Sequence, residues 1–263
     1  MKTYTLITGA SKGIGYEFAK IFASRGHNLI LVARSKDLLE EIKKEFEKKY
    51  KVEVIVIVQD LAEELASKKI FTKIKESELI VDVLINNAGF GDYQEFVNSS
   101  YDKNMNMIEV NIKALTAMTH LFLPDMIDRN NGKILNIGSI GSFFPGPYMS
   151  VYYATKAYVL SFTEALSEEL KNTNIVVACL CPGTTDTNFF HVANADNSPM
   201  VQLLKPVEPK DVALYGYKRL MKKKVVSIHG FKNRFLVFCN RIVSRKGVRK
   251  IVYKIQKKRK TKQ

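Results

Sequence analysis

Short apolar runs alternate with stretches of helical periodicity along most of the chain. The runs predict strands over residues 3–8, 28–33, 52–58, 80–85, 133–137, 174–181 and 225–229. Between them, apolar residues recur three and four positions apart, as Ile14, Phe18 and Phe22 do, and this spacing predicts helices. Because strands and helices alternate, the predicted fold class is α/β, with a doubly wound parallel sheet in a single domain.

A glycine-containing turn joins the first predicted strand to the first predicted helix. It runs Thr8-Gly9-Ala10-Ser11-Lys12-Gly13-Ile14-Gly15. Glycine lets the backbone turn tightly and approach a pyrophosphate, whose charge is stabilised by free N–H groups at the start of the helix. The turn predicts a Rossmann-type dinucleotide-binding domain, with cofactor contacts from Gly9, Ser11, Lys12, Gly13, Ile14 and Gly15.

The second predicted strand ends at Arg34, a position that distinguishes between cofactors in such folds. An acidic residue there would bind the ribose hydroxyls of NAD, whereas an Arg suits the 2′-phosphate of NADP. Lys12 adds a second cation. The sequence therefore predicts NADP(H) as the cofactor, and the alternative is two solvated surface cations.

Four further positions carry candidate chemistry. Tyr152 and Lys156 are four residues apart, so on a helix they share a face, and an ammonium near a phenol lowers the phenol's pKa. Alone, this pair is weak evidence, because many surface helices carry one. Ser139 follows the strand at 133–137, at the sheet edge where ligands collect. Asn111 interrupts a helical region of about 101–129, and its alternative role is a buried amide bonded to backbone.

Taken in order, these motifs resemble those of the short-chain dehydrogenase/reductase family over residues 3 to about 190. Ser139 and Tyr152 are 13 residues apart, as the family pattern expects. The positions that carry the resemblance are the Thr8 to Gly15 turn, Asp60-Leu61, Asn86-Asn87-Ala88-Gly89, Asn111, Ser139, Tyr152, Lys156, Pro182-Gly183 and Thr187.

The resemblance implies a role for each catalytic candidate. Tyr152 would be the general acid in carbonyl reduction and the base in alcohol oxidation. Lys156 would hold the nicotinamide ribose and lower the pKa of Tyr152, Ser139 would bind the substrate oxygen, and Asn111 would hold a water that links Lys156 to solvent. Further cofactor contacts implied by the resemblance are Asp60, Leu61, Asn87, Ala88, Gly89, Pro182, Gly183, Thr185 and Thr187. The reaction requires no metal.

The expected function is hydride transfer between NADP(H) and an apolar ketone, aldehyde or 3-oxoacyl thioester. Residues 184–206 suit a substrate lid, and their apolar members, with Phe143, Phe144 and Tyr148, suggest an apolar pocket or, equally, core packing. Apart from Lys205 these segments hold no cation, so a small anionic substrate is disfavoured. The rival function is a non-catalytic NADP-binding adaptor that its basic C-terminal segment holds at a membrane or a partner.

Charge separates the chain into two parts. The net charge of the 263 residues is +15, yet residues 212–263 alone contain 18 Lys and Arg and no Asp or Glu. We therefore divide the chain into a catalytic domain, 1–230, and a basic helical extension, 231–263, with two helices joined near Gly247. The extension could pack on the body and end as a solvated tail, lie on anionic lipid, or bind an acidic carrier protein or a CoA phosphate. Nucleic acid is less favoured.

The expected location is the cytoplasm, with peripheral membrane contact as an option. No apolar run approaches the length of a membrane span, and no leader precedes the first strand. Cys179, Cys181 and Cys239 lack metal-ligand spacing and are predicted to be reduced thiols. The resemblance also implies a homo-oligomer.

Overall fold

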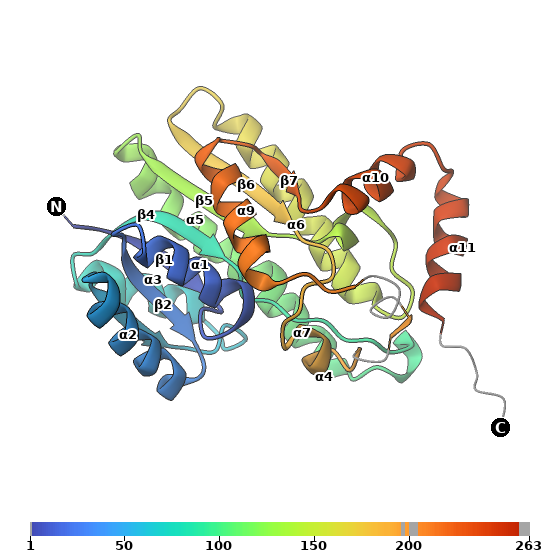
Figure 1. The fold of residues 1–263 in the computed structure, drawn as a ribbon, viewed down its shortest axis with the longest axis horizontal. Coiled ribbons are helices and arrows are strands. Elements are labelled where there is room, and N and C mark those ends of the chain that lie inside the picture. The colour runs from blue at the N-terminus through green and yellow to red at the C-terminus, as the bar shows by residue number, and fades with distance from the viewer. Residues whose placement is uncertain (1, 196–197, 200–204, 258–263) are drawn as a thin grey trace.

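A seven-stranded parallel sheet forms the centre of the molecule in the computed structural model, which describes residues 2–195, 198–199 and 205–257 (Figure 1). The strand order is β3-β2-β1-β4-β5-β6-β7. The strands are β1 Thr3–Thr8, β2 Asn28–Ala33, β3 Val54–Val58, β4 Ile80–Asn86, β5 Gly132–Ile137, β6 Ile175–Cys181 and β7 Val226–Ile228. This sheet confirms the predicted α/β fold of Rossmann type.

Helices cover both faces of the sheet, which is why its strands are apolar on both sides. One face carries α1 Gly13–Ala23, α2 Lys36–Tyr50 and α9 Pro209–Met221. The other carries α3 Ala66–Glu76, α5 Leu115–Asp128 and α6 Ser150–Glu169. The apolar residues that predict a helix after the glycine turn form the buried side of α1. Phe18 and Phe22 are fully buried against the sheet.

The helical region around Asn111 is divided into three parts rather than being one regular helix. α4 Tyr101–Ile108 leads into a π-helical turn, Glu109–Ala114, which continues into α5. Asn is unfavourable inside a regular α-helix because its amide competes for backbone partners. Here the wider turn contains Asn111, whose side chain is buried and bonded outside the helix. Such turns often occur at functional sites.

The sheet topology defines where a ligand can bind. The chain moves outward from β1 to β2 and β3, then returns to the other side of β1 to form β4. Loops on the two sides of this switch point diverge, so a crevice opens beyond the carboxyl ends of β1 and β4. The glycine turn after Thr8 and the segment after Asn86 border this crevice.

The C-terminal extension forms two helices that lie at one end of the molecule (Figure 1). They are α10 Phe231–Asn240 and α11 Arg245–Gln256. The prediction of two helices is confirmed, but Gly247, near which the joint was predicted, lies in the first turn of α11. The joint is residues 241–244, because Ser244 caps α11 by accepting a hydrogen bond from the Gly247 N–H at 3.2 Å.

Candidate active site

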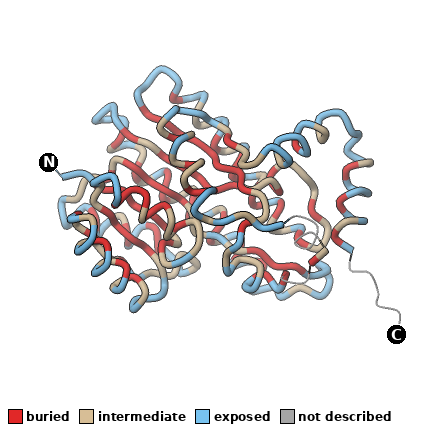
Figure 2. Tube along the Cα trace, in the orientation of Figure 1, coloured by how far each residue is buried: buried red, intermediate tan, exposed pale blue. Residues whose placement is uncertain are grey.

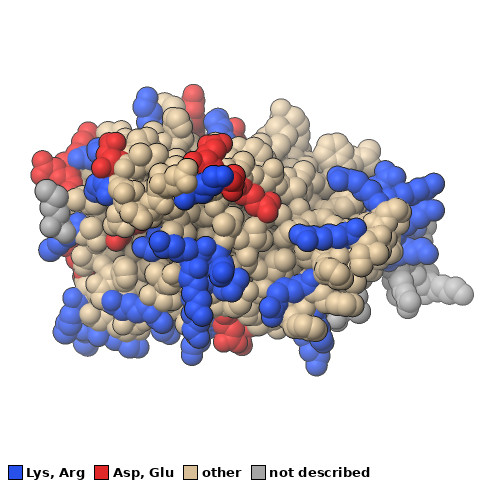
Figure 3. Space-filling view, turned by 90° about the horizontal axis from the view of Figure 1, so that it is seen from above, with Lys and Arg blue, Asp and Glu red and all other residues tan. Residues whose placement is uncertain are grey.

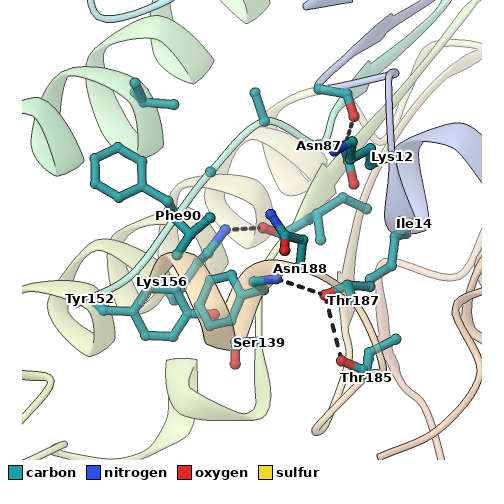
Figure 4. A pocket seen from close by; sticks show the side chains of 18 of the residues that line it. Lys12, Ile14, Asn87, Phe90, Ser139, Tyr152, Lys156, Thr185, Thr187 and Asn188 are labelled. Carbon is teal, nitrogen blue, oxygen red and sulfur yellow. Dashed lines mark hydrogen bonds between the residues drawn. The ribbon is translucent and has the colours of Figure 1, made fainter. Parts of the chain in front are cut away.

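A single cavity of about 570 Å³ unites almost every predicted site residue at the carboxyl ends of the strands (Figure 4). Its predicted lining residues are Gly9, Ser11, Lys12, Gly13, Ile14, Arg34, Asp60, Leu61, Asn87, Ala88, Gly89, Ser139, Tyr152, Lys156, Pro182, Gly183, Thr185 and Thr187. Two predicted residues, Gly15 and Asn111, do not line the cavity and act from behind its wall.

The glycine turn is held against β4 by hydrogen bonds. Asn87 Nδ2 donates to the carbonyl oxygens of Thr8 and Gly9, at 3.0 and 3.1 Å. Thr8 Oγ1 accepts from the backbone N–H groups of Asn87 and Ala88. A Cβ on Gly15 would lie 2.2 Å from Gly9 O and 2.5 Å from Asn87 Nδ2, so only glycine fits there. Gly15 therefore shapes the turn, while Gly9 and Gly13 supply its left-handed conformations.

Two cations border the end of the cavity beside β2. Arg34 Nη1 lies 3.5 Å from Asp60 Oδ2, but the Arg34 side chain is 76% exposed. Such an exposed ion pair contributes little, so Arg34 can exchange it for another anion. Asp60 is fixed by a turn, because its Oδ1 accepts from the Ala62 N–H at 3.0 Å. With Lys12 also in the wall, this end of the cavity suits a phosphate group.

Ser139 comes from the turn after β5, and Tyr152 and Lys156 come from α6. Ser139 caps the 3₁₀ turn Ile140–Phe143, and its Oγ accepts from the Gly141 N–H at 3.0 Å. Tyr152 and Lys156 lie one turn apart on α6, and Lys156 Nζ is 6.0 Å from the Tyr152 ring centroid. Nζ also donates to the carbonyl of Ile137 at the end of β5, at 2.7 Å. The three side chains therefore converge on one place in the cavity (Figure 4).

Burial sets the protonation states of this group. Tyr152 is half-buried as a residue, but desolvation of its phenol raises its pKa to about 12, against the smaller opposing effect of a hydrogen bond with Ser139. Desolvation also lowers the pKa of Lys156 to about 8, with Cys179 and Cys181 acting in the opposite direction. The net shift of the Tyr152 pKa is therefore opposite to the lowering predicted from Lys156, because desolvation of the phenol is the largest effect. The phenol stays protonated, as a proton donor requires.

The Asn111 amide is buried and hydrogen-bonded to backbone, which is the alternative role that the sequence allows. Its Oδ1 accepts from the Phe90 N–H at 3.1 Å, and its Nδ2 donates to Phe90 O and Thr155 Oγ1, both at 3.0 Å. A Cβ on Gly89 would lie 2.9 Å from Asn111 Oδ1 and 3.3 Å from Lys156 Nζ. Asn111 thus lies beside the Lys156 ammonium across Gly89, and a water-holding role for it stays a prediction.

Neighbouring residues of the same types have other tasks. Ser142 Oγ donates to the carbonyl of Lys156 at 2.7 Å and accepts from the Ser139 N–H, so it fixes α6 to the 3₁₀ turn. Tyr153 is buried, and its hydroxyl accepts a hydrogen bond from Gln256. Ser139 and Tyr152 are therefore the serine and tyrosine available to a substrate.

The C-terminal helix α11 packs behind the wall of the site, and the sequence did not predict this contact. Gln256 is buried, and its Nε2 donates to Tyr153 Oη at 3.0 Å. Tyr93 Oη donates to the carbonyl of Gln256. The ring of Tyr253 stacks on that of Tyr148, with centroids 5.9 Å apart. The one sequence feature that indicates this contact is Gln256 continuing the four-residue spacing of Val248 and Val252.

The substrate side of the cavity is apolar. Its apolar wall residues are Phe90, Met149, Phe189, Phe190 and Val192. The Phe189 ring, in the short helix α7 Phe189–Val192, lies 5.2 Å from the Tyr152 ring. Lys103 is also in the wall, but its Nζ is paired with Asp92 at 2.6 Å.

Three of the aromatic residues predicted for the substrate pocket lie elsewhere in the structure. Phe143, Phe144 and Tyr148 do not line the cavity but pack in apolar clusters beside it, so for them the core-packing alternative holds. The lid residues Met200, Leu203 and Leu204 lie outside the described residues. Cys179 and Cys181 are buried free thiols in β6.

Comparison with known proteins identifies the family. The family model described as short chain dehydrogenase matches residues 3–198. The chain therefore belongs to the short-chain dehydrogenase/reductase family of oxidoreductases. Among solved structures, it resembles a short-chain dehydrogenase from Sphingobium yanoikuyae in complex with NADPH, with a TM-score of 0.82 and 31% identity, covering 91% of this chain and 94% of that one.

Two curated relatives have names that differ in activity. The chain is 36% identical over 185 residues to the very-long-chain 3-oxoacyl-CoA reductase of Bos taurus, covering 68% of this chain and 58% of the relative. It is also 36% identical over 198 residues to the inactive hydroxysteroid dehydrogenase-like protein 1 of Homo sapiens, covering 72% of this chain and 59% of the relative. The matched region is thus less than two thirds of either relative.

Proposed function

We propose that this protein catalyses the NADPH-dependent reduction of an apolar ketone, aldehyde or 3-oxoacyl thioester. The observation that carries the proposal is the convergence of a protonated Tyr152 phenol with Ser139 and Lys156 in the cavity bordered by the glycine turn. A proton donor, a second hydroxyl and a cation are the groups that a carbonyl oxygen needs as it gains charge.

Each catalytic residue has a separate role in the reduction. A nicotinamide cofactor, held by the glycine turn and by residues 182–187, would supply the hydride to the carbonyl carbon. Ser139 Oγ hydrogen-bonds the carbonyl oxygen, and the Tyr152 hydroxyl transfers its proton to that oxygen. The phenolate left on Tyr152 is stabilised by the Lys156 ammonium until it is reprotonated from solvent. In the reverse direction the phenolate takes the proton of the alcohol.

NADP(H) is the proposed cofactor because the cavity end beside β2 carries Arg34 and Lys12. A 2′-phosphate would give Arg34 a charge-assisted partner in place of its weak ion pair with Asp60. The tip of β2 runs Ala33-Arg34-Ser35 and offers no carboxylate to the ribose hydroxyls of NAD. The NADPH complex of the Sphingobium yanoikuyae relative supports the same choice.

The proposed substrate is apolar because the wall that faces Tyr152 is built from Phe, Met and Val side chains. The cation in this wall, Lys103, is already neutralised by Asp92. The names of several relatives, as very-long-chain 3-oxoacyl-CoA reductases, support a 3-oxoacyl thioester within this class. A cytoplasmic location and a homo-oligomer stay predictions from the sequence.

A non-catalytic adaptor is the rival function, and a relative whose name includes "inactive" keeps it in view. The placement of Ser139, Tyr152 and Lys156 around one cavity supports the enzyme instead, because a protein that only binds the cofactor has no use for a buried proton donor.

The test is the rate of NADPH oxidation, followed by absorbance, with a panel of 3-oxoacyl thioesters, ketosteroids, aromatic aldehydes and sugars. NADH is assayed in parallel. We expect turnover with apolar carbonyl compounds and NADPH, and none with the sugars. Absence of turnover across the panel by protein that binds NADPH would favour the adaptor.

A further inference from the structure

An apolar stripe on α10 faces away from the body of the protein. Phe231, Phe235 and Phe238 are four and three residues apart, so they lie along one side of the helix, and Ile242 continues the spacing into the joint after α10. Their residues are 76%, 58%, 57% and 73% exposed. The other side of α10 packs on the body, as one sequence alternative predicts for the first helix, so the stripe is its outer side, and Figure 2 shows α10 as largely exposed. The solvated tail that the same alternative predicts for the second helix is wrong, because α11 has buried residues.

The opposite side of the extension fixes this orientation. Val237, on the inner side of α10, is buried, and Asn240 Nδ2 donates to the carbonyl of Phe143 at 2.7 Å. In α11 the inner side is Val248, Val252 and Gln256, all buried. These residues attach both helices to the body of the protein. The stripe therefore has a fixed orientation toward solvent and does not belong to an unattached tail.

The exposed stripe lies within a strongly basic segment. Residues 231–257 contain nine Lys and Arg and no Asp or Glu. All nine are exposed, and none takes part in an ion pair among the residues that the structure describes. In Figure 3, Lys and Arg side chains lie over much of this face, but at the end that the extension occupies in Figure 1 no Asp or Glu is seen beside them. The segment thus combines uncovered aromatic side chains with unneutralised positive charge.

We propose that the outer surface of α10 and α11 docks the protein on an anionic lipid bilayer. Phe and Ile side chains enter the boundary between headgroups and acyl chains, and the surrounding cations attract anionic headgroups. α10 has 10 residues, far fewer than the roughly 20 needed to span a bilayer. Across the described residues, no helix is long and apolar enough for a span. The helices therefore lie in the membrane surface.

Charge favours lipid over a second copy of this chain. Two copies that met through this surface would bring nine cations against nine cations without an acidic partner on either side. An anionic bilayer offers the opposite charge over a wide area and an apolar layer beneath it. The inner side of these helices contacts the wall of the active site, through the Gln256–Tyr153 hydrogen bond, so docking of the outer side would hold the substrate side of the cavity close to lipid.

The placement of the substrate side close to lipid rests on the proposed function, whereas docking on the bilayer does not. The experiment is flotation of the full chain with vesicles of phosphatidylcholine that contain phosphatidylglycerol, compared with vesicles of phosphatidylcholine alone. We expect the wild type to float with the anionic vesicles only. NADPH binding and the thermal unfolding midpoint of each variant report whether it is folded, without any assay of turnover.

Two variants separate the apolar and the electrostatic contributions. Phe235→Ser with Phe238→Ser is expected to weaken vesicle binding at least tenfold, because each Phe loses an apolar side chain that lipid would bury. Its control is Leu65→Asn with Ile127→Ser, which removes two other exposed apolar side chains, and Asn suits the left-handed backbone at residue 65.

The charge variant replaces Arg241, Arg245 and Lys246 by Gln, and about fivefold weaker binding is expected for each cation removed. Its control replaces the exposed Lys44, Lys48 and Lys49 of α2, at the other end of the molecule (Figure 1). Both controls should bind vesicles as the wild type does.

Three results would overturn the proposal. The first is no flotation of folded wild-type protein, and the second is equal flotation of the wild type and the Phe235→Ser, Phe238→Ser variant. The third is a dimer, measured by sedimentation without vesicles, that this variant converts to a monomer, because the surface would then belong to a second copy. Flotation of the purified protein with vesicles would show that the surface binds lipid without any acidic protein partner.

Discussion

Gln256 Nε2 donates a hydrogen bond to Tyr153 Oη over 3.0 Å, and this bond joins the C-terminal helix α11 to the helix that carries Tyr152. Gln256 is buried, and its carbonyl also accepts from Tyr93. The basic extension is therefore continuous with the wall of the active site, although the family match ends before it begins.

Replacing Gln256 tests this connection. Gln256→Ala removes a buried hydrogen bond and side-chain packing, so we expect a loss of about 1–3 kcal/mol in the free energy of unfolding and a higher KM for apolar substrates. The Kd for NADPH should not change. Lys257→Ala, at the exposed neighbouring position, is the control. Unchanged KM and stability in Gln256→Ala would show that α11 does not support the site.

The pH dependence of reduction follows from Lys156. Its pKa is lowered to about 8 by burial, so the ammonium is present below that pH and is lost as the pH rises through it. Tyr152, with a pKa raised to about 12, stays protonated throughout this range. We expect kcat/KM for reduction to be constant below about pH 8 and to fall above it. A rate that rises through pH 8 would contradict the role of the charged lysine.

Cofactor choice depends on Arg34. Because a hydrogen bond to a charged group contributes about 1.5–3 kcal/mol, Arg34→Ala should weaken NADPH binding by about tenfold to 100-fold and leave NADH binding unchanged. Binding can be followed by the fluorescence of the reduced cofactor, since the chain has no Trp. Lys36→Ala, two residues away and exposed, is the control. Equal weakening for both cofactors would mean that Arg34 does not contact the 2′-phosphate.

The glycine turn gives a steric prediction. In Gly15→Ala the new Cβ would lie 2.2 Å from Gly9 O, so we expect NADPH binding to be lost and the free energy of unfolding to fall by about 1–3 kcal/mol. Gly26→Ala is the matched control, because Gly26 has a left-handed backbone and open space around its Cα. It should cost about 1–2 kcal/mol and leave NADPH binding intact. NADPH binding by Gly15→Ala as tight as the wild type's would contradict this account of the turn.

Much of the fold could be predicted because local patterns determine it. The strands β1 and β2 have the predicted bounds, because the glycine or charged residue that follows each apolar run marks where the strand ends. The site was predictable for the same reason, because parallel strands bring their carboxyl ends to one edge of the sheet.

What could not be predicted depends on contacts between distant residues. The pKa of Tyr152 follows from how much water the folded cavity excludes, which spacing along α6 does not determine. The sequence of α10 does not determine which side of the helix faces solvent, and the burial of Val237 and the contact of Asn240 with Phe143 fix the exposed side. Gln256 is 103 residues from Tyr153, so no local pattern relates them.

The most direct test of the central claim is the turnover of Tyr152→Phe. The variant keeps the ring and removes the hydroxyl that donates the proton, so we expect kcat to fall by about 100-fold to 10,000-fold while the Kd for NADPH stays that of the wild type. Turnover by Tyr152→Phe at the wild-type rate would contradict the account, because the proton would then come from another group.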